Sequence, residues 1–156
     1  VNNIIWLNGG LEGDDTDGHI DNLARFVNST TIAYISEEDK SDANYKNLKS
    51  VADSLKKATN QDGKQFTIIP LPMPSAIKHK GFRLPASYAN FYIGNRTVLV
   101  PAFNDPCDEV AEDILKMCFP KRKIVRIDSR ILIKGQGGVH CLTQQQPASS
   151  TRRVST

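Results

Sequence analysis

The sequence predicts an α/β fold built from repeated hairpin–helix–strand units. Paired short apolar runs, separated by turn residues, predict hairpins at residues 23–35 and 88–100. A segment with helical periodicity follows each hairpin, and an apolar strand follows each helix. The same order of elements therefore occurs twice, which is typical of a modular α/β protein.

The first unit is preceded by an apolar run and an acidic segment. Residues 3–7 are mostly apolar and predict a buried strand. The acidic segment leads directly into the first hairpin, so we expect a strand to hold His19 and Asp21 at a rigid edge. In residues 41–60 apolar side chains recur three and four positions apart, which predicts a helix, and residues 65–71 predict the next strand.

The second unit has clear helix boundaries. Asp105 and Pro106 supply a cap and a first helical residue, and the helix ends near Cys118, before Pro120. Residues 123–127 predict the strand that completes the unit.

Length and composition favour one domain. The chain has 156 residues, of which 39% are hydrophobic and 24% charged, and this is enough for one real core. We assign residues 1–147 to this domain and residues 148–156, rich in Ser, Thr and Arg, to a flexible tail. No apolar run is long enough for a membrane span. The chain opens almost directly into a predicted strand and without Met, so we expect it to be a piece of a longer protein.

Charge and cysteine usage exclude several classes of partner. The net charge is +3, and the Lys and Arg residues are scattered without interleaved aromatics, which argues against nucleic-acid binding. The three cysteines, Cys107, Cys118 and Cys141, have no CxxC spacing. Their odd number predicts reduced thiols and a cytoplasmic location, rather than a disulfide framework or a zinc site.

The acidic segment, residues 12–21, is the first candidate wall of a functional site. It contains no Lys or Arg, and it surrounds His19 with five acids: Glu12, Asp14, Asp15, Asp17 and Asp21. Because like charges repel, a bound cationic group would stabilise such a segment. A calcium loop with Gly18 as its sixth residue would need carboxylates at Gly13 and Ala24, so we expect no metal.

The second candidate wall is the glycine-rich turn at residues 135–138, which leads to Cys141. Glycines let a backbone approach a ligand closely, and a cysteine near carboxylates and a histidine is a candidate nucleophile. The alternative for a free cysteine is a small buried hydrophobe, which we accept for Cys107 and Cys118. If Cys141 lies on a strand, its neighbour His140 faces away from the site.

Four stretches of this chain resemble one known family. Residues 13–26 read Gly-Asp-Asp-Thr-Asp-Gly-His-Ile-Asp-Asn-Leu-Ala-Arg-Phe and resemble the central signature of agmatine deiminases, in the bacterial-type peptidyl-arginine deiminase family. Residues 137–145 resemble the nucleophile motif of the same family, and residues 84–91 and 100–103 resemble its connecting segments. The resemblance extends over nearly all of residues 1–147.

The resemblance implies a fold and a reaction. Members of this guanidine-modifying superfamily form a five-bladed α/β propeller, the pentein fold, with the active site on its axis. They convert a guanidino group to a ureido group and release ammonia without a metal or cofactor. By position, Cys141 attacks the guanidino carbon to give an amidino-thioether, His19 moves protons, and Asp21 binds guanidinium nitrogens.

The chemistry of a guanidinium agrees with these roles. A carboxylate accepts its N–H groups in a bidentate geometry, so Asp21 suits the charged end of the substrate. We expect Asp15 to contact the far, amine end and Gly137 to let the backbone approach the ligand. Asp14 and Asp17 are expected to brace the loop through backbone N–H groups.

Three functions remain open. The first is deimination of agmatine to N-carbamoylputrescine, a step of putrescine and polyamine biosynthesis. The second is deimination of free or peptidyl arginine. The third is a non-catalytic guanidinium-binding module, because the family chain is about twice as long and this segment matches only its C-terminal part. We expect the missing N-terminal half, a second chain or a homo-oligomer to complete the propeller.

Overall fold

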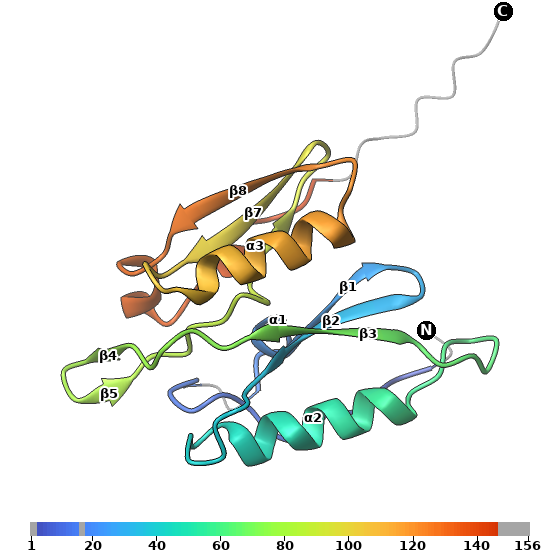
Figure 1. The fold of residues 1–156 in the computed structure, drawn as a ribbon, viewed down its shortest axis with the longest axis horizontal. Coiled ribbons are helices and arrows are strands. Elements are labelled where there is room, and N and C mark those ends of the chain that lie inside the picture. Colours follow the sequence, from blue (N-terminus) through green and yellow to red (C-terminus); the bar gives the residue numbers. More distant parts are fainter. Residues whose placement is uncertain (1–2, 16–17, 147–156) are drawn as a thin grey trace, which may run out of the picture.

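The computed structural model describes residues 3–15 and 18–146, which form two sheet-and-helix units joined by a long connection (Figure 1). The predicted tail at residues 148–156 lies outside the described part of the chain. A small hairpin, β4 (Lys78–His79) and β5 (Phe82–Arg83), projects from the connection.

The first unit is a three-stranded mixed sheet with one helix. Its strand order is β1-β2-β3, with β2 antiparallel to β1 and parallel to β3. A parallel neighbour requires a crossover, which the helix α2 supplies. The elements are α1 (Ile20–Leu23), β1 (Ala24–Asn28), β2 (Thr31–Ser36), α2 (Tyr45–Lys57) and β3 (Thr67–Pro72).

The second unit repeats this connectivity. Its strand order is β6-β7-β8, again with one antiparallel and one parallel pair, and α3 is the crossover. The Asp105 carboxylate accepts a hydrogen bond from the Cys107 N–H at the start of α3, as predicted from the sequence. The elements are β6 (Tyr92–Ile93), β7 (Thr97–Ala102), α3 (Cys107–Cys118) and β8 (Lys123–Asp128). The repeated hairpin–helix–strand order is therefore confirmed.

The helices α2 and α3 differ in their position relative to the two sheets. α2 covers the outer side of the first sheet and buries Leu48, Val51 and Leu55. α3 lies between the two units and packs against both β3 and β8 (Figure 1). Two short 3-10 helices, η1 (Leu132–Gly135) and η2 (His140–Leu142), follow β8. Within the described residues, no helix is both long and apolar enough to cross a membrane.

Two local predictions are wrong. Residues 3–7 form no strand, and Ile4 and Trp6 are 65% and 79% exposed. An apolar run becomes a strand only if a partner strand pairs with it, and none does so in the part of the chain described. The acidic segment does not lead straight into β1 either, because the helical turn α1 intervenes.

Candidate active site

Asp21, His140 and Cys141 meet although they are far apart in sequence. Asp21 lies on α1, and its partners lie on η2. His140 Nδ1 is 2.7 Å from Asp21 Oδ2, and Cys141 Sγ is 3.4 Å from the same oxygen. The structure thus brings together two of the predicted site residues, Asp21 and Cys141, and adds a third.

The prediction that His140 faces away is wrong. It assumed a strand, in which neighbouring side chains point to opposite faces. His140 and Cys141 instead lie in the 3-10 helix η2, which turns once in three residues, so neighbours project only about 120° apart. Both side chains can therefore reach Asp21.

His19 is paired within the acidic segment. Its Nδ1 is 3.0 Å from Asp14 Oδ1, and its backbone N–H donates to Asp14 Oδ2 at 3.0 Å. The Asp14 carboxylate is almost fully buried, and the His19 ring is 42% exposed. Asp14 therefore braces the loop through a backbone N–H, as expected from the sequence, and the expected brace by Asp17 lies outside the described residues.

The same loop is held tightly against the β4–β5 hairpin. A Cβ added to Gly13, which has φ +88°, would lie 2.1 Å from the backbone oxygen of Arg83. Asp15 is exposed on this segment, and ligand atoms of Asp14, Asp15 and His19 lie within 4.8 Å of one another. Because both Asp14 oxygens already contact His19, this cluster is an internally bonded loop.

The electrostatic environment keeps Asp21 ionised. Burial raises the pKa of its carboxyl, but hydrogen bonds from His140 and Cys141, with the charges of His140 and Arg25, lower it below the ordinary value. Asp21 is therefore a carboxylate at neutral pH, as binding of a cation requires.

Arg25 is a site residue that sequence analysis missed. Its guanidinium donates to the Phe91 carbonyl oxygen at 2.9 Å and lies 5.2 Å from the centre of the Phe91 ring. Burial lowers the pKa of Arg25, and the negative charges of Asp21 and Cys141 oppose this shift. Arg25 lies within residues 13–26, the stretch that resembles the family signature, but its residue type alone did not predict these contacts.

Asn90 was also missed. Its side-chain Nδ2 lies 3.1 Å from Cys141 Sγ and 2.9 Å from Asn22 Oδ1, and its Oδ1 accepts the His140 N–H at 2.8 Å. Asn90 is only 1% exposed. A buried asparagine with this many partners is a structural connector between α1 and η2.

The glycine turn packs closely on these residues. A Cβ at Gly138 would lie 2.4 Å from Asn90 Oδ1, and one at Gly137 would lie 3.3 Å from the Cβ of Cys141. Gln136, just before them, has a left-handed backbone with φ +65°. The close contacts of this turn are with Asn90 and Cys141, and the prediction that Gly137 lets the backbone approach a ligand stays a prediction.

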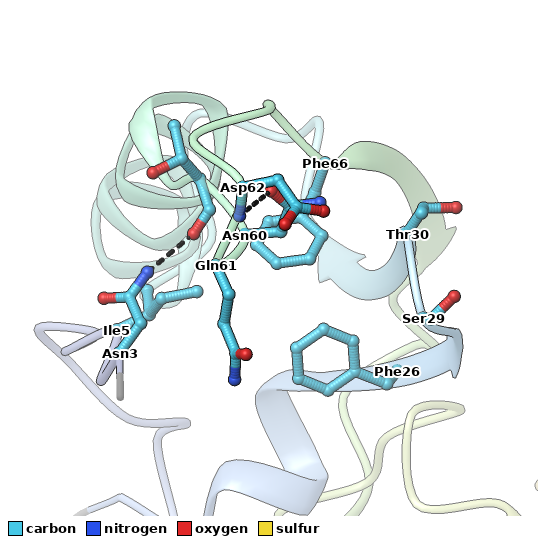
Figure 2. Close-up of a pocket in the computed structure, with 10 residues that line it drawn as sticks. Asn3, Ile5, Phe26, Ser29, Thr30, Asn60, Gln61, Asp62 and Phe66 are labelled. Atoms are coloured by element: carbon cyan, nitrogen blue, oxygen red, sulfur yellow. Dashed lines mark hydrogen bonds between the residues drawn. The ribbon is translucent and has the colours of Figure 1, made fainter. Parts of the chain in front are cut away.

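A hollow elsewhere on the first unit is a separate feature. It measures about 420 Å³, and Figure 2 shows Phe26 and Phe66 on one side and Asn3, Gln61 and Asp62 around it. Its lining includes neither Cys141 nor the residues bonded to it. We therefore place the candidate active site at η2 and α1, not in this hollow.

The chain is similar to known deiminases over most of its length. A family model of Porphyromonas-type peptidyl-arginine deiminases matches residues 1–147. A Legionella pneumophila (strain Paris) protein named "Putative agmatine deiminase" is 40% identical over 147 residues, which are 94% of this chain and 42% of that protein.

Solved structures of deiminases are also similar to this chain. The "Putative Arginine Deiminase from Porphyromonas gingivalis" has 47% identity and a TM-score of 0.87, over 89% of this chain and 41% of that one. Agmatine deiminase of C. jejuni with substrate bound has 39% identity and a TM-score of 0.83, over 90% of this chain and 40% of that one. The chain thus spans less than half the length of these relatives.

Proposed function

Because the chain belongs to the Porphyromonas-type peptidyl-arginine deiminase family, we propose that it is the nucleophile-bearing segment of a hydrolase that removes ammonia from a guanidino group. The observation that carries the proposal is the contact of Cys141 and His140 with one oxygen of Asp21. This reaction needs a thiol, a carboxylate and an imidazole, and here the thiol and the imidazole each lie within hydrogen-bond reach of the same ionised carboxylate.

The geometry supports a two-step reaction. A guanidinium held by Asp21 lies with its carbon beside the sulfur, because Sγ is only 3.4 Å from Asp21 Oδ2. The Cys141 thiolate forms a C–S bond to that carbon, and the C–N bond breaks as ammonia leaves with an added proton. Water then attacks the amidino-thioether, loses a proton to a base, and displaces the thiolate to leave the ureido product.

Two histidines are candidates for the proton transfers. The family resemblance assigns this role to His19, which is half-exposed and bonded to Asp14. His140 lies nearer to the proposed nucleophile through their shared partner Asp21. Ammonia release and agmatine binding of His19→Ala and His140→Ala distinguish the two. The histidine that transfers protons is the one whose alanine variant loses turnover but still binds agmatine.

We propose agmatine as the substrate. The C. jejuni structure is an agmatine deiminase with substrate bound, and the Legionella relative carries the same activity in its name. Agmatine ends in an ammonium group, which the exposed carboxylate of Asp15 suits, whereas the carboxylate of arginine would be repelled. Arginine is the second candidate, because the P. gingivalis structure is titled an arginine deiminase.

The proposal extends to the assembly. The two units share one connectivity, so we propose that they are two blades of a five-bladed propeller within a domain at residues 1–147. The remaining blades come from an N-terminal half or a second chain, with the backbone at Gly137 facing the substrate. The three free thiols fit a reducing compartment such as the cytoplasm. A homo-oligomeric assembly and a place in polyamine biosynthesis are further parts of the proposal.

Ammonia release from agmatine, measured together with agmatine binding on the full-length protein, tests the proposal. Cys141→Ser should abolish turnover and retain binding, with Cys118→Ser as the matched control. Asp21→Asn should weaken binding and turnover by roughly 2–5 kcal/mol, since it removes a desolvated charge partner. Binding without ammonia release in the full-length wild type would instead support the non-catalytic guanidinium-binding module.

Cysteine labelling gives a second test on the 156-residue chain. A haloacetamidine, which carries a guanidinium-like charge, should alkylate Cys141 before Cys107 and Cys118. Burial raises the pKa of both other thiols, and nearby Asp105 also raises that of Cys107. Iodoacetamide, which lacks the charge, should show less preference; equal labelling of all three thiols by the amidine would refute the assignment.

A further inference from the structure

Asn90 lies where two elements of the site, α1 and η2, meet. Its Nδ2 group faces Cys141 Sγ on η2 and Asn22 Oδ1 on α1, and its Oδ1 faces the His140 N–H. Its two N–H groups and its carbonyl oxygen therefore all have partners. The neighbouring Ser87 extends this network, because its hydroxyl donates to the Asn22 carbonyl oxygen at 2.7 Å.

The orientation of the Asn90 amide is fixed by these partners. Its oxygen must face the backbone N–H of His140, and only its NH₂ group can serve the two acceptors on the other side. The Asn90 oxygen is closely packed on the side of Gly138, since a single carbon added there would overlap it. The N–H that points at sulfur is therefore held in place before any substrate binds.

A thiolate at Cys141 needs such a donor. The Asp21 carboxylate lies 3.4 Å from the sulfur, so a second negative charge there would be repelled. A hydrogen bond to an ionised acceptor is about twice as strong as one to a neutral group, so an N–H facing sulfur favours the thiolate over the thiol.

We infer that Asn90 is a further catalytic residue, whose side-chain amide stabilises the Cys141 thiolate and fixes its direction relative to Asp21 and His140. The inference rests on the proposed role of Cys141 as the nucleophile. The same amide also positions η2 through the His140 N–H.

The first test is the alkylation rate of Cys141 by iodoacetamide in the 156-residue chain, followed for each cysteine by mass spectrometry. Asn90→Asp keeps the shape and the acceptor for His140 but replaces the N–H donor that faces sulfur with a charged oxygen. We expect it to slow Cys141 alkylation at least tenfold at pH 7 and to a smaller extent at higher pH, where the fraction of thiolate is larger in both proteins. Cys107 and Cys118 are internal references, and Ser87→Ala, which weakens the same network without touching sulfur, should leave the rate within twofold.

The second test follows the wild-type Asn90 side chain, so it does not depend on the folding of an Asn90 variant. In ¹H–¹⁵N spectra the Asn90 side-chain amide signals should move over the pH range in which Cys141 alkylation accelerates. Cys141→Ala should abolish that movement.

Several results would overturn the inference. One is a wild-type rate of Cys141 alkylation in Asn90→Asp at pH 7, and another is an equal slowing of that rate in Ser87→Ala. A third is movement of the Asn90 amide signals with pH that is unchanged in Cys141→Ala. Failure of the proposed deiminase function would give a different result. The full-length protein would release no ammonia, while the Asn90 amide signals would still depend on Cys141.

Discussion

The substitution Gly138→Ala should disturb the site, because its methyl group would clash with Asn90. Gly138 does not occupy the left-handed backbone region, so an alanine there introduces no backbone strain. The added Cβ would lie 2.4 Å from Asn90 Oδ1, 2.7 Å from its Cγ and 3.1 Å from its Cβ. Something must move, and Asn90 is buried and bonded on three sides.

The magnitude follows from these contacts. Overpacking a tight interior costs about 1–3 kcal/mol. Displacing the Asn90 amide also strains or breaks hydrogen bonds worth about 1 kcal/mol each. We therefore expect Gly138→Ala to lower the free energy of unfolding by about 2–4 kcal/mol. With a urea m-value of about 2 kcal/mol/M, the unfolding midpoint falls by about 1–2 M.

Urea denaturation, monitored by circular dichroism, measures this effect. Another glycine of the same turn, Gly135, provides the control. A Cβ at Gly135 would meet nothing within 4 Å, so Gly135→Ala should change the midpoint by less than about 0.3 M. Alkylation of Cys141 should slow in Gly138→Ala only. Equal midpoints for the two variants would refute the claim that Asn90 is held rigidly against the turn.

Three further outcomes are expected. Tyr88→Phe should cost about 1.5–3 kcal/mol in urea denaturation, because the Tyr88 hydroxyl donates to the Asp108 carboxylate at 2.7 Å and both residues are buried; an unchanged midpoint would contradict this. The Asp21 pKa is lowered on folding, so its contribution to stability is present above the ordinary value of 3.8 and is lost as pH falls through the lowered pKa. The stability difference between wild type and Asp21→Asn should therefore shrink below about pH 4, and a constant difference would argue against the bond from His140. Gly13→Ala combines positive φ with a backbone clash and should lower the unfolding free energy by about 3 kcal/mol in thermal melts, whereas Tm within 2 °C of wild type would show that the loop yields.

The repeated architecture could be predicted because its signals are local. Helical periodicity and turn residues lie within each unit, and the structure has both crossover helices and both hairpins. The run at residues 3–7 failed because a strand depends on a partner elsewhere, which composition does not reveal. Trp6, at 79% exposure, shows that apolar character alone does not determine burial.

The site was only partly predictable for the same reason. Asp21 and Cys141 were found because their residue types and motifs carry chemistry. His140 was misplaced because the assumed strand is a 3-10 helix. Asn90 and Arg25 act through contacts with residues 51 and 66 positions away, and neither residue type suggests such contacts.

The contacts of Asp21 with His140 and Cys141 span 119 and 120 residues. Contacts of such long range form late, since closing a long loop costs entropy before the contact stabilises anything. During synthesis on the ribosome, Asp21 emerges well before its partners, and both units must dock before the thiol gains its carboxylate and amide neighbours. On the role that we propose for Asn90, the cysteine is therefore less reactive while the chain is still unfolded and most open to oxidants. Its reactivity should consequently report completion of the whole tertiary structure, and not the folding of either unit alone.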